Sequence, residues 1–221
     1  FQQRTADGLE ALKQASRQMP SLVWVIGAPI AHEGPGRQLN NGLLALKDGE
    51  VVLQYAKQLL PTYNIFNERR HFEPGPDVAP VLRVGAARVG FMVCEDGWND
   101  SGSEYEVNPF RRMRDAAPDF VVSINASPSD IGKRELRHKV FAEASRRHDL
   151  PLVYVNQVGG QDELIFDGGS FAVGAEGELL ARIGHFVEDF EIVDVEPAGA
   201  SRPTDRIEAP LEPMEELWEA L

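Results

Sequence analysis

The sequence predicts a layered α/β domain with mixed β-sheets. Short and almost continuous apolar runs, such as 22–28 (LVWVIGA) and 120–125 (FVVSIN), are typical of strands buried on both faces. Segments with apolar residues at helical spacing separate several of these runs, and glycine-containing turns join others as hairpins. The 221 residues are enough for one large domain.

The expected elements begin with a helix over 1–19, which Pro20 ends. Turn signals at Asp48-Gly49, at 85–87 (GAA) and at 176–178 (EGE) predict three hairpins. Further helices are expected over 109–117 and 135–148. The predicted strands, in chain order, are 22–28, 43–46, 51–55, 81–84, 89–93, 120–125, 152–157, 171–173, 179–183 and 190–195.

The two ends indicate a fragment. The first helix starts without a methionine and as if entered in mid-course, and the helix expected over 214–221 carries an apolar face with no packing partner. Ordinary frayed ends are the alternative interpretation. We expect a domain over 1–195, a linker over 196–213 that is rich in Pro, Ala and charge, and the start of a further domain at 214–221.

Composition and charge argue against several classes of function. The 22 Lys and Arg residues against 35 Asp and Glu residues give a net charge of −13, which disfavours nucleic acids and anionic membranes as partners. No apolar run approaches the roughly 20 residues of a membrane span. The single cysteine excludes an intramolecular disulfide and a multi-cysteine zinc site, and the scattered histidines give a metal site no support. We expect a cytoplasmic protein.

Three residues are candidates for chemistry. Cys94 follows the predicted strand 89–93, at the end of a strand where α/β proteins place ligands. A nucleophilic cysteine needs a nearby cation, and Lys57 could supply it. Taken singly, Cys94 would more often be a buried apolar residue, Lys57 a solvated lysine and Glu68 a surface carboxylate.

Their surrounding motifs change this interpretation. The segments 57–63 (KQLLPTY), 93–96 (VCED) and 125–128 (NASP), followed by Gly132-Lys133, resemble the carbon-nitrogen hydrolase (nitrilase) superfamily. The resemblance is closer to its glutamine amidotransferase branch, as found in glutamine-dependent NAD synthetases, through the segments 66–72 (FNERRHF), 158–168 (VGGQDELIFDG) and 215–221. It implies a nitrilase-like αββα sandwich, here without its first strand.

The resemblance also implies roles for individual residues. Cys94 would be the nucleophile that attacks the glutamine carboxamide, Lys57 would stabilise the charged intermediate, and Glu68 would keep Lys57 charged and oriented. The residues at glutamine-binding positions are Tyr63, Glu95, Trp98, Ser127 and Lys133. For Tyr63 and Trp98, plain core packing is the competing interpretation.

One departure from the family pattern matters. The family's general-base glutamate lies on the first strand, which no segment here matches, so we expect this polypeptide alone to be a poor glutaminase. The implied partners are L-glutamine and a C-terminal synthetase domain, to which ATP and magnesium would belong, with no cofactor in this chain. A homo-oligomer is expected. The alternatives are a free-standing carbon-nitrogen hydrolase, of the omega-amidase or carbamoylase type, and a non-catalytic interaction module of the same fold.

Overall fold

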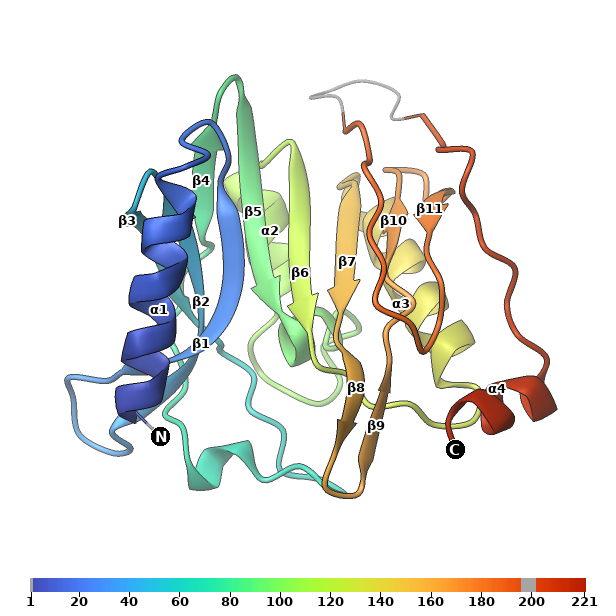
Figure 1. The fold of residues 1–221 in the computed structure, drawn as a ribbon, viewed down its shortest axis with the longest axis horizontal. Helices are drawn as coiled ribbons and strands as arrows, with labels where there is room; N and C mark the ends of the chain where they lie inside the picture. Colours follow the sequence, from blue (N-terminus) through green and yellow to red (C-terminus); the bar gives the residue numbers. More distant parts are fainter. Residues whose placement is uncertain (1, 196–201) are drawn as a thin grey trace.

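Two β-sheets face each other between outer layers of helices in the computed structural model, which describes residues 2–195 and 202–221 (Figure 1). The smaller sheet has the order β1-β2-β3, and the larger has the order β11-β10-β7-β6-β5-β4. A separate β8-β9 hairpin extends from the end of β7 (Figure 1). The strands are β1 (Trp24–Ala31), β2 (Leu39–Lys47), β3 (Glu50–Ala56), β4 (Val81–Val84), β5 (Ala87–Val93), β6 (Phe120–Asn125), β7 (Leu152–Asn156), β8 (Val158–Gln161), β9 (Leu164–Asp167), β10 (Phe171–Val173) and β11 (Leu179–Arg182).

The helices cover the outer faces of the two sheets (Figure 1). α1 (Gln2–Ser16) packs its leucines on the smaller sheet, against Leu44 and Leu46 of β2. α2 (Pro109–Ala116) and α3 (Lys133–His148) pack on the larger sheet through Phe110 and Phe141. The order of layers is therefore helix, sheet, sheet, helix, which confirms the predicted αββα sandwich.

The core between the sheets holds the strand ends that matter for the site. Leu43 of β2 and Tyr55 of β3 pack against Phe91 and Val93 of β5. β5, β6 and β7 run parallel, with Val93 beside Ile124 and Asn125 beside Asn156. Their carboxyl ends consequently meet at one edge of the larger sheet, which is where ligands bind in α/β proteins.

Most expected elements are confirmed, with boundary shifts of a few residues. The helix expected over 1–19 ends at Ser16, and the strand expected over 22–28 runs from Trp24 to Ala31. The three predicted hairpins all form, and the helix expected over 214–221 is α4 (Pro213–Glu219). The β8-β9 hairpin was not predicted, because its glycine-rich first strand lacks apolar alternation.

The predicted strand over 190–195 is wrong. Phe190 and Ile192 are 79% and 75% exposed, and no strand forms there. The free edge of β11 is instead occupied by residues 204–208: Thr204 N donates to Leu180 O (2.7 Å), and Glu208 N donates to Arg182 O (2.9 Å). A strand needs a neighbouring backbone to bond with. Residues 204–208 already form the backbone hydrogen bonds to the edge of β11, so 190–195 cannot pair there.

Part of the expected linker 196–213 lies outside the described residues, namely 196–201. The chain that follows is attached to α3 by Arg134, whose Nη2 donates to Leu211 O at 2.8 Å. On α4, the side chains of Met214 and Trp218 lie mostly in solvent. Throughout residues 2–195 and 202–221, every helix is too short or too polar to cross a bilayer.

Candidate active site

Cys94 lies where β5 ends and a short 3-10 helix, η2 (Cys94–Gly97), begins. Its backbone is left-handed, with φ at +45°, a conformation that a residue with a side chain adopts at a cost and that is common at functional sites. A lone cysteine of the apolar core would have no need of this conformation. The Cys94 side chain at this turn is partly buried and lines the cavity described below.

Asp96 fixes this turn to the chain that carries Lys57. Its carboxylate, fully buried, accepts hydrogen bonds from Val93 N (3.2 Å) on the Cys94 side and from Tyr55 Oη (2.8 Å) on β3. It also accepts from the N–H groups of Gln58 (3.1 Å) and Leu59 (3.0 Å), directly after Lys57. One side chain thereby positions both strand ends. No sequence motif considered above singled out Asp96 for this role.

Lys57 is 1% exposed, and its ammonium lies 2.6 Å from Glu68 Oε1. Asn41 Nδ2 donates to the other oxygen, Glu68 Oε2, at 3.0 Å. Burial by itself lowers the pKa of Lys57, but the negative charges available at Cys94 and Glu68 outweigh it and raise the pKa above its ordinary value. Lys57 is therefore a buried, permanently charged ammonium at neutral pH.

Cys94, Lys57, Glu68 and Glu95 line one cavity of about 300 Å³. Asn41 and Gly42 of β2 contribute to its wall from the smaller sheet, so the cavity lies between the two sheets. The structure thus brings together the predicted nucleophile Cys94, the predicted cation Lys57 and its predicted support Glu68, with one of the five residues predicted to bind substrate.

The charge balance around the thiol favours its protonated form. Burial raises the pKa of Cys94, and Lys57 opposes this with its positive charge. The carboxylates of Glu95 and Glu68 raise the pKa further, while a hydrogen bond with the Ala126 backbone lowers it. The net direction is upward, so the thiolate is scarce at neutral pH in this chain.

Glu95 is buried beside the cavity and already has two phenol partners. Tyr63 Oη lies 3.0 and 3.1 Å from its two oxygens, and Tyr105 Oη donates to Oε1 at 3.0 Å. Burial raises the pKa of Glu95, and these two hydrogen bonds partly offset that rise. Tyr105 was missed in the sequence because it lies in an irregular loop, ten residues beyond Glu95, with no spacing signal.

The other predicted binding residues lie beside this cavity. Tyr63 and Lys133 line an adjoining hollow of about 400 Å³, which shares Phe66 with the first. Trp98 lines neither: its ring packs edge-on against Phe141 at 5.9 Å, and Lys133 Nζ lies 4.4 Å above it. For Trp98, packing and a cation–π contact are what the structure shows.

Ser127 also stands behind the cavity wall. Its backbone N–H donates to Asn156 Oδ1 (3.0 Å), and Arg137 Nη2 lies 3.3 Å from its carbonyl oxygen and 3.4 Å from its hydroxyl. These contacts fix the turn after β6 that also carries Ala126, a residue of the cavity lining. Within the described part of the chain, His, Cys, Asp and Glu side chains nowhere gather in a group of three that could hold a metal ion.

Comparisons with known proteins agree with this architecture. A family model described as "Carbon-nitrogen hydrolase" matches residues 4–202. A glutamine-dependent NAD(+) synthetase of Synechocystis sp. is 34% identical over 216 residues, which is 94% of this chain but 38% of that relative. The chain therefore spans well under half the length of this curated relative.

Solved structures show the same relationship. A glutamine-dependent NAD+ synthetase from Acinetobacter baumannii has a TM-score of 0.80 and 31% identity, covering 95% of this chain and 38% of that one. A carbon-nitrogen hydrolase from Helicobacter pylori has a TM-score of 0.71 over 83% of this chain and 65% of its own, and its 22% identity shows the fold alone. With its two facing sheets and a family match that reaches from residue 4 to 202, the chain belongs to the carbon-nitrogen hydrolase family.

Proposed function

We propose that this chain hydrolyses the side-chain amide of L-glutamine through a thioester on Cys94. The observation that carries the proposal is the shared cavity of Cys94, Lys57 and Glu68, in which a buried ammonium lies beside the one thiol of the chain. The similarity to glutamine-dependent NAD(+) synthetases supports glutamine as the amide.

The reaction would proceed in two halves. The Cys94 thiolate attacks the carboxamide carbon, and the carbonyl electron pair moves to oxygen, where the Lys57 ammonium and the backbone N–H of Glu95 stabilise the oxyanion. The oxyanion electron pair re-forms the carbonyl as the C–N bond breaks, and the nitrogen takes up the proton that the thiol lost and leaves as ammonia. Water attacks the thioester carbon, so that glutamate leaves and the thiol is restored. Glu68 holds Lys57 in place and keeps it charged.

Removal of the thiol proton is the weak step in this chain. Of the residues that line the cavity, Glu68 and Glu95 are the carboxylates, and both are engaged, with Lys57 and with two tyrosines respectively. We therefore expect the 221-residue polypeptide to turn glutamine over slowly.

In the complete protein, the ammonia would amidate deamido-NAD to NAD in an ATP-dependent step. The chain's similarity to part of several NAD(+) synthetases supports this. We propose that ATP and magnesium bind outside this chain and that the protein works as a homo-oligomer. For substrate binding we propose Glu95, Tyr63 and Lys133 at the two adjoining cavities, with Trp98 and Ser127 holding the walls.

Covalent labelling of the complete protein tests the glutaminase proposal. 6-Diazo-5-oxo-L-norleucine, a reactive glutamine analogue, should add one equivalent to Cys94, and glutamine should protect the thiol from it. Cys94→Ala should abolish labelling, and Lys57→Gln should slow it at least tenfold. Lys139→Gln, which removes a charge from the exposed side of α3, should leave the rate unchanged.

Other outcomes would point elsewhere. Labelling that a different amide prevents, but glutamine does not, would favour a free-standing carbon-nitrogen hydrolase. A Cys94 that does not react would favour an interaction module of the same fold. For the complete protein, Cys94→Ala should abolish glutamine-dependent formation of NAD but preserve formation from added ammonia.

A further inference from the structure

A second cavity, of about 120 Å³, shares no lining residue with the Cys94 cavity and is lined by four basic side chains and one acidic side chain, Glu135. Three of the basic residues come from α3, namely Arg134, Arg137 and His138, and the fourth is Arg182 at the end of β11. We propose that this basic cavity binds a small oxyanion, a single phosphate or carboxylate group. The inference is independent of the glutaminase proposal.

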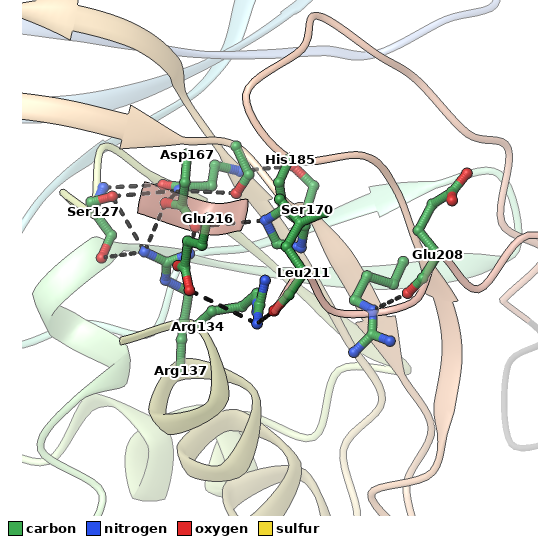
Figure 2. A network of polar contacts seen from close by, with 12 residues as sticks. Ser127, Arg134, Arg137, Asp167, Ser170, His185, Glu208, Leu211 and Glu216 are labelled. Atoms are coloured by element: carbon green, nitrogen blue, oxygen red, sulfur yellow. Dashed lines mark hydrogen bonds and ion pairs between the residues drawn. The ribbon is translucent and has the colours of Figure 1, made fainter. Parts of the chain in front are cut away.

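The helix brings the three α3 residues to one face. Positions 134, 137 and 138 have the spacing i, i+3 and i+4, which aligns side chains along one side of a helix. Arg182 completes the cavity from the sheet, and Pro210 of the C-terminal segment borders it. Arg134 reaches the same segment through Leu211 and Glu216 (Figure 2). Segments far apart in sequence thus converge around one concave basic surface.

Acidic side chains compensate this charge only in part. Arg137 is engaged by Asp167, with Nη1 3.0 Å from Oδ2. Arg134 Nη2 lies 2.6 Å from Oε1 of Glu135, whose side chain is 58% exposed and also lines the cavity, and 3.8 Å from Oε2 of Glu216. Arg182 Nε donates to a carbonyl, Glu208 O, at 2.6 Å, and over residues 2–195 and 202–221 no carboxylate comes within 4.0 Å of its guanidinium.

Three buried nitrogens of the cavity residues have no partner in the described chain. These are Nη1 of Arg134, whose residue is 7% exposed, Nε of Arg137, whose residue is 1% exposed, and Nε2 of His138. Buried donors in native proteins are almost always met by another protein group, an ordered water or a bound ion, so these nitrogens mark a place where a polar molecule belongs. All three nitrogens can donate to oxygen, which is the chemistry of an oxyanion ligand.

The electrostatics agree with the geometry. Burial and the charge of Arg134 lower the pKa of Arg182, and burial and the charge of Arg182 lower the pKa of His138. Like charges therefore repel each other across the cavity, and an anion between them would remove that repulsion. The volume admits one phosphate or carboxylate group but no nucleotide. Guanidinium groups bind both anions through paired N–H donors.

Thermal unfolding of the 221-residue chain tests the proposal with inorganic phosphate and with acetate, each against sodium chloride at equal ionic strength. We expect a saturable rise in Tm of about 3–5 °C at ten times Kd with at least one of the two anions. The anion that acts at the lower concentration identifies the source, phosphate or carboxylate. Equal Tm values in all three salts would overturn the proposal.

Two variants place the effect in this cavity. Arg182→Gln, on β11, should reduce the anion-dependent rise in Tm at least threefold. His138→Gln, on α3, should also reduce this rise in Tm. Arg146→Gln is the control, because it removes an arginine charge from an exposed position of α3 outside the cavity lining. An anion response that is unchanged in both cavity variants, or lost equally in Arg146→Gln, would also overturn the proposal.

Discussion

Arg137 and Asp167 form an ion pair in which both side chains are buried, with Nη1 3.0 Å from Oδ2 and Nη2 3.1 Å from Oδ1 (Figure 2). Nη2 of the same guanidinium also reaches Ser127, on the turn that follows β6. Asp167, at the end of β9, is therefore linked through Arg137 to the wall behind Cys94. The pair is a structural support for the candidate site.

Replacement of Arg137 should expose how much the fold depends on this pair. Arg137→Met leaves the Asp167 carboxylate buried without its two guanidinium contacts and with His185 Nδ1, at 3.6 Å, as its remaining basic neighbour, so we expect the free energy of unfolding in urea to fall by about 3–5 kcal/mol. Arg137→Met/Asp167→Asn removes both charges and should recover a substantial part of that loss. If the double variant were no more stable than the single one, the unpaired charge would not be the cause.

Asp96 gives the second prediction. Asp96→Ala removes the acceptor of Tyr55 Oη and of three backbone N–H groups, all buried, so the free energy of unfolding should fall by more than about 4 kcal/mol. Asp194→Ala, at an exposed position, controls for loss of a carboxylate and should change it by less than about 0.5 kcal/mol. Similar losses in the two variants would contradict the bridging role of Asp96.

Local signals account for what could be predicted from the sequence. Asp48 and Gly49 both have positive φ, at 49° and 81°, which is the turn chemistry that such a pair favours in a hairpin. The apolar run 89–93 ends at Cys94, so the position of the thiol at a strand end followed directly from periodicity. The motif resemblance then predicted that Lys57 and Glu68 would lie beside it, and they line the same cavity.

The missed features depend on contacts between distant segments. Two segments, 190–195 and 204–208, compete for the free edge of β11, and 204–208 forms the hydrogen bonds. The apolar alternation of Phe190 and Ile192 predicts a strand but says nothing about the competing segment. The partners of Glu95 and Asp96 come from loops and strands up to 41 residues away. Side chains of this kind have no periodicity that would reveal them.

The tyrosines predict how stability responds to alkaline pH. The chain has four, and the pKa of each is raised, first of all by burial: Tyr55, Tyr63, Tyr105 and Tyr154. The unfolded phenols lose their protons near pH 10 while the folded ones keep them, so stability must fall as pH rises above about 10. Phenolate absorbance and loss of far-ultraviolet circular dichroism should therefore rise together in one titration.

A matched variant tests the cause for two of these tyrosines. Glu95→Gln removes the carboxylate that accepts from Tyr63 and Tyr105, so part of the phenolate signal should move to lower pH and precede unfolding. Titration of the wild-type tyrosines near pH 10 in a chain that keeps its circular dichroism would show that the folded state does not protect them.

The last prediction concerns the thiol itself. Because Cys94 is the one cysteine, alkylation of the chain by iodoacetamide, followed by mass spectrometry, reports on a single group. Burial raises the pKa of Cys94, so the rate of alkylation should still rise about tenfold per pH unit at pH 8.5. The alkylation rate of a free thiol begins to level off at that pH. Lys57→Gln takes away the charge that lowers this pKa and should move the profile to higher pH, whereas Lys139→Gln should not. A plateau below pH 8.5 in the wild-type chain would mean that Lys57 outweighs burial and the two glutamates, and the slow turnover expected of the 221-residue polypeptide would then need another cause.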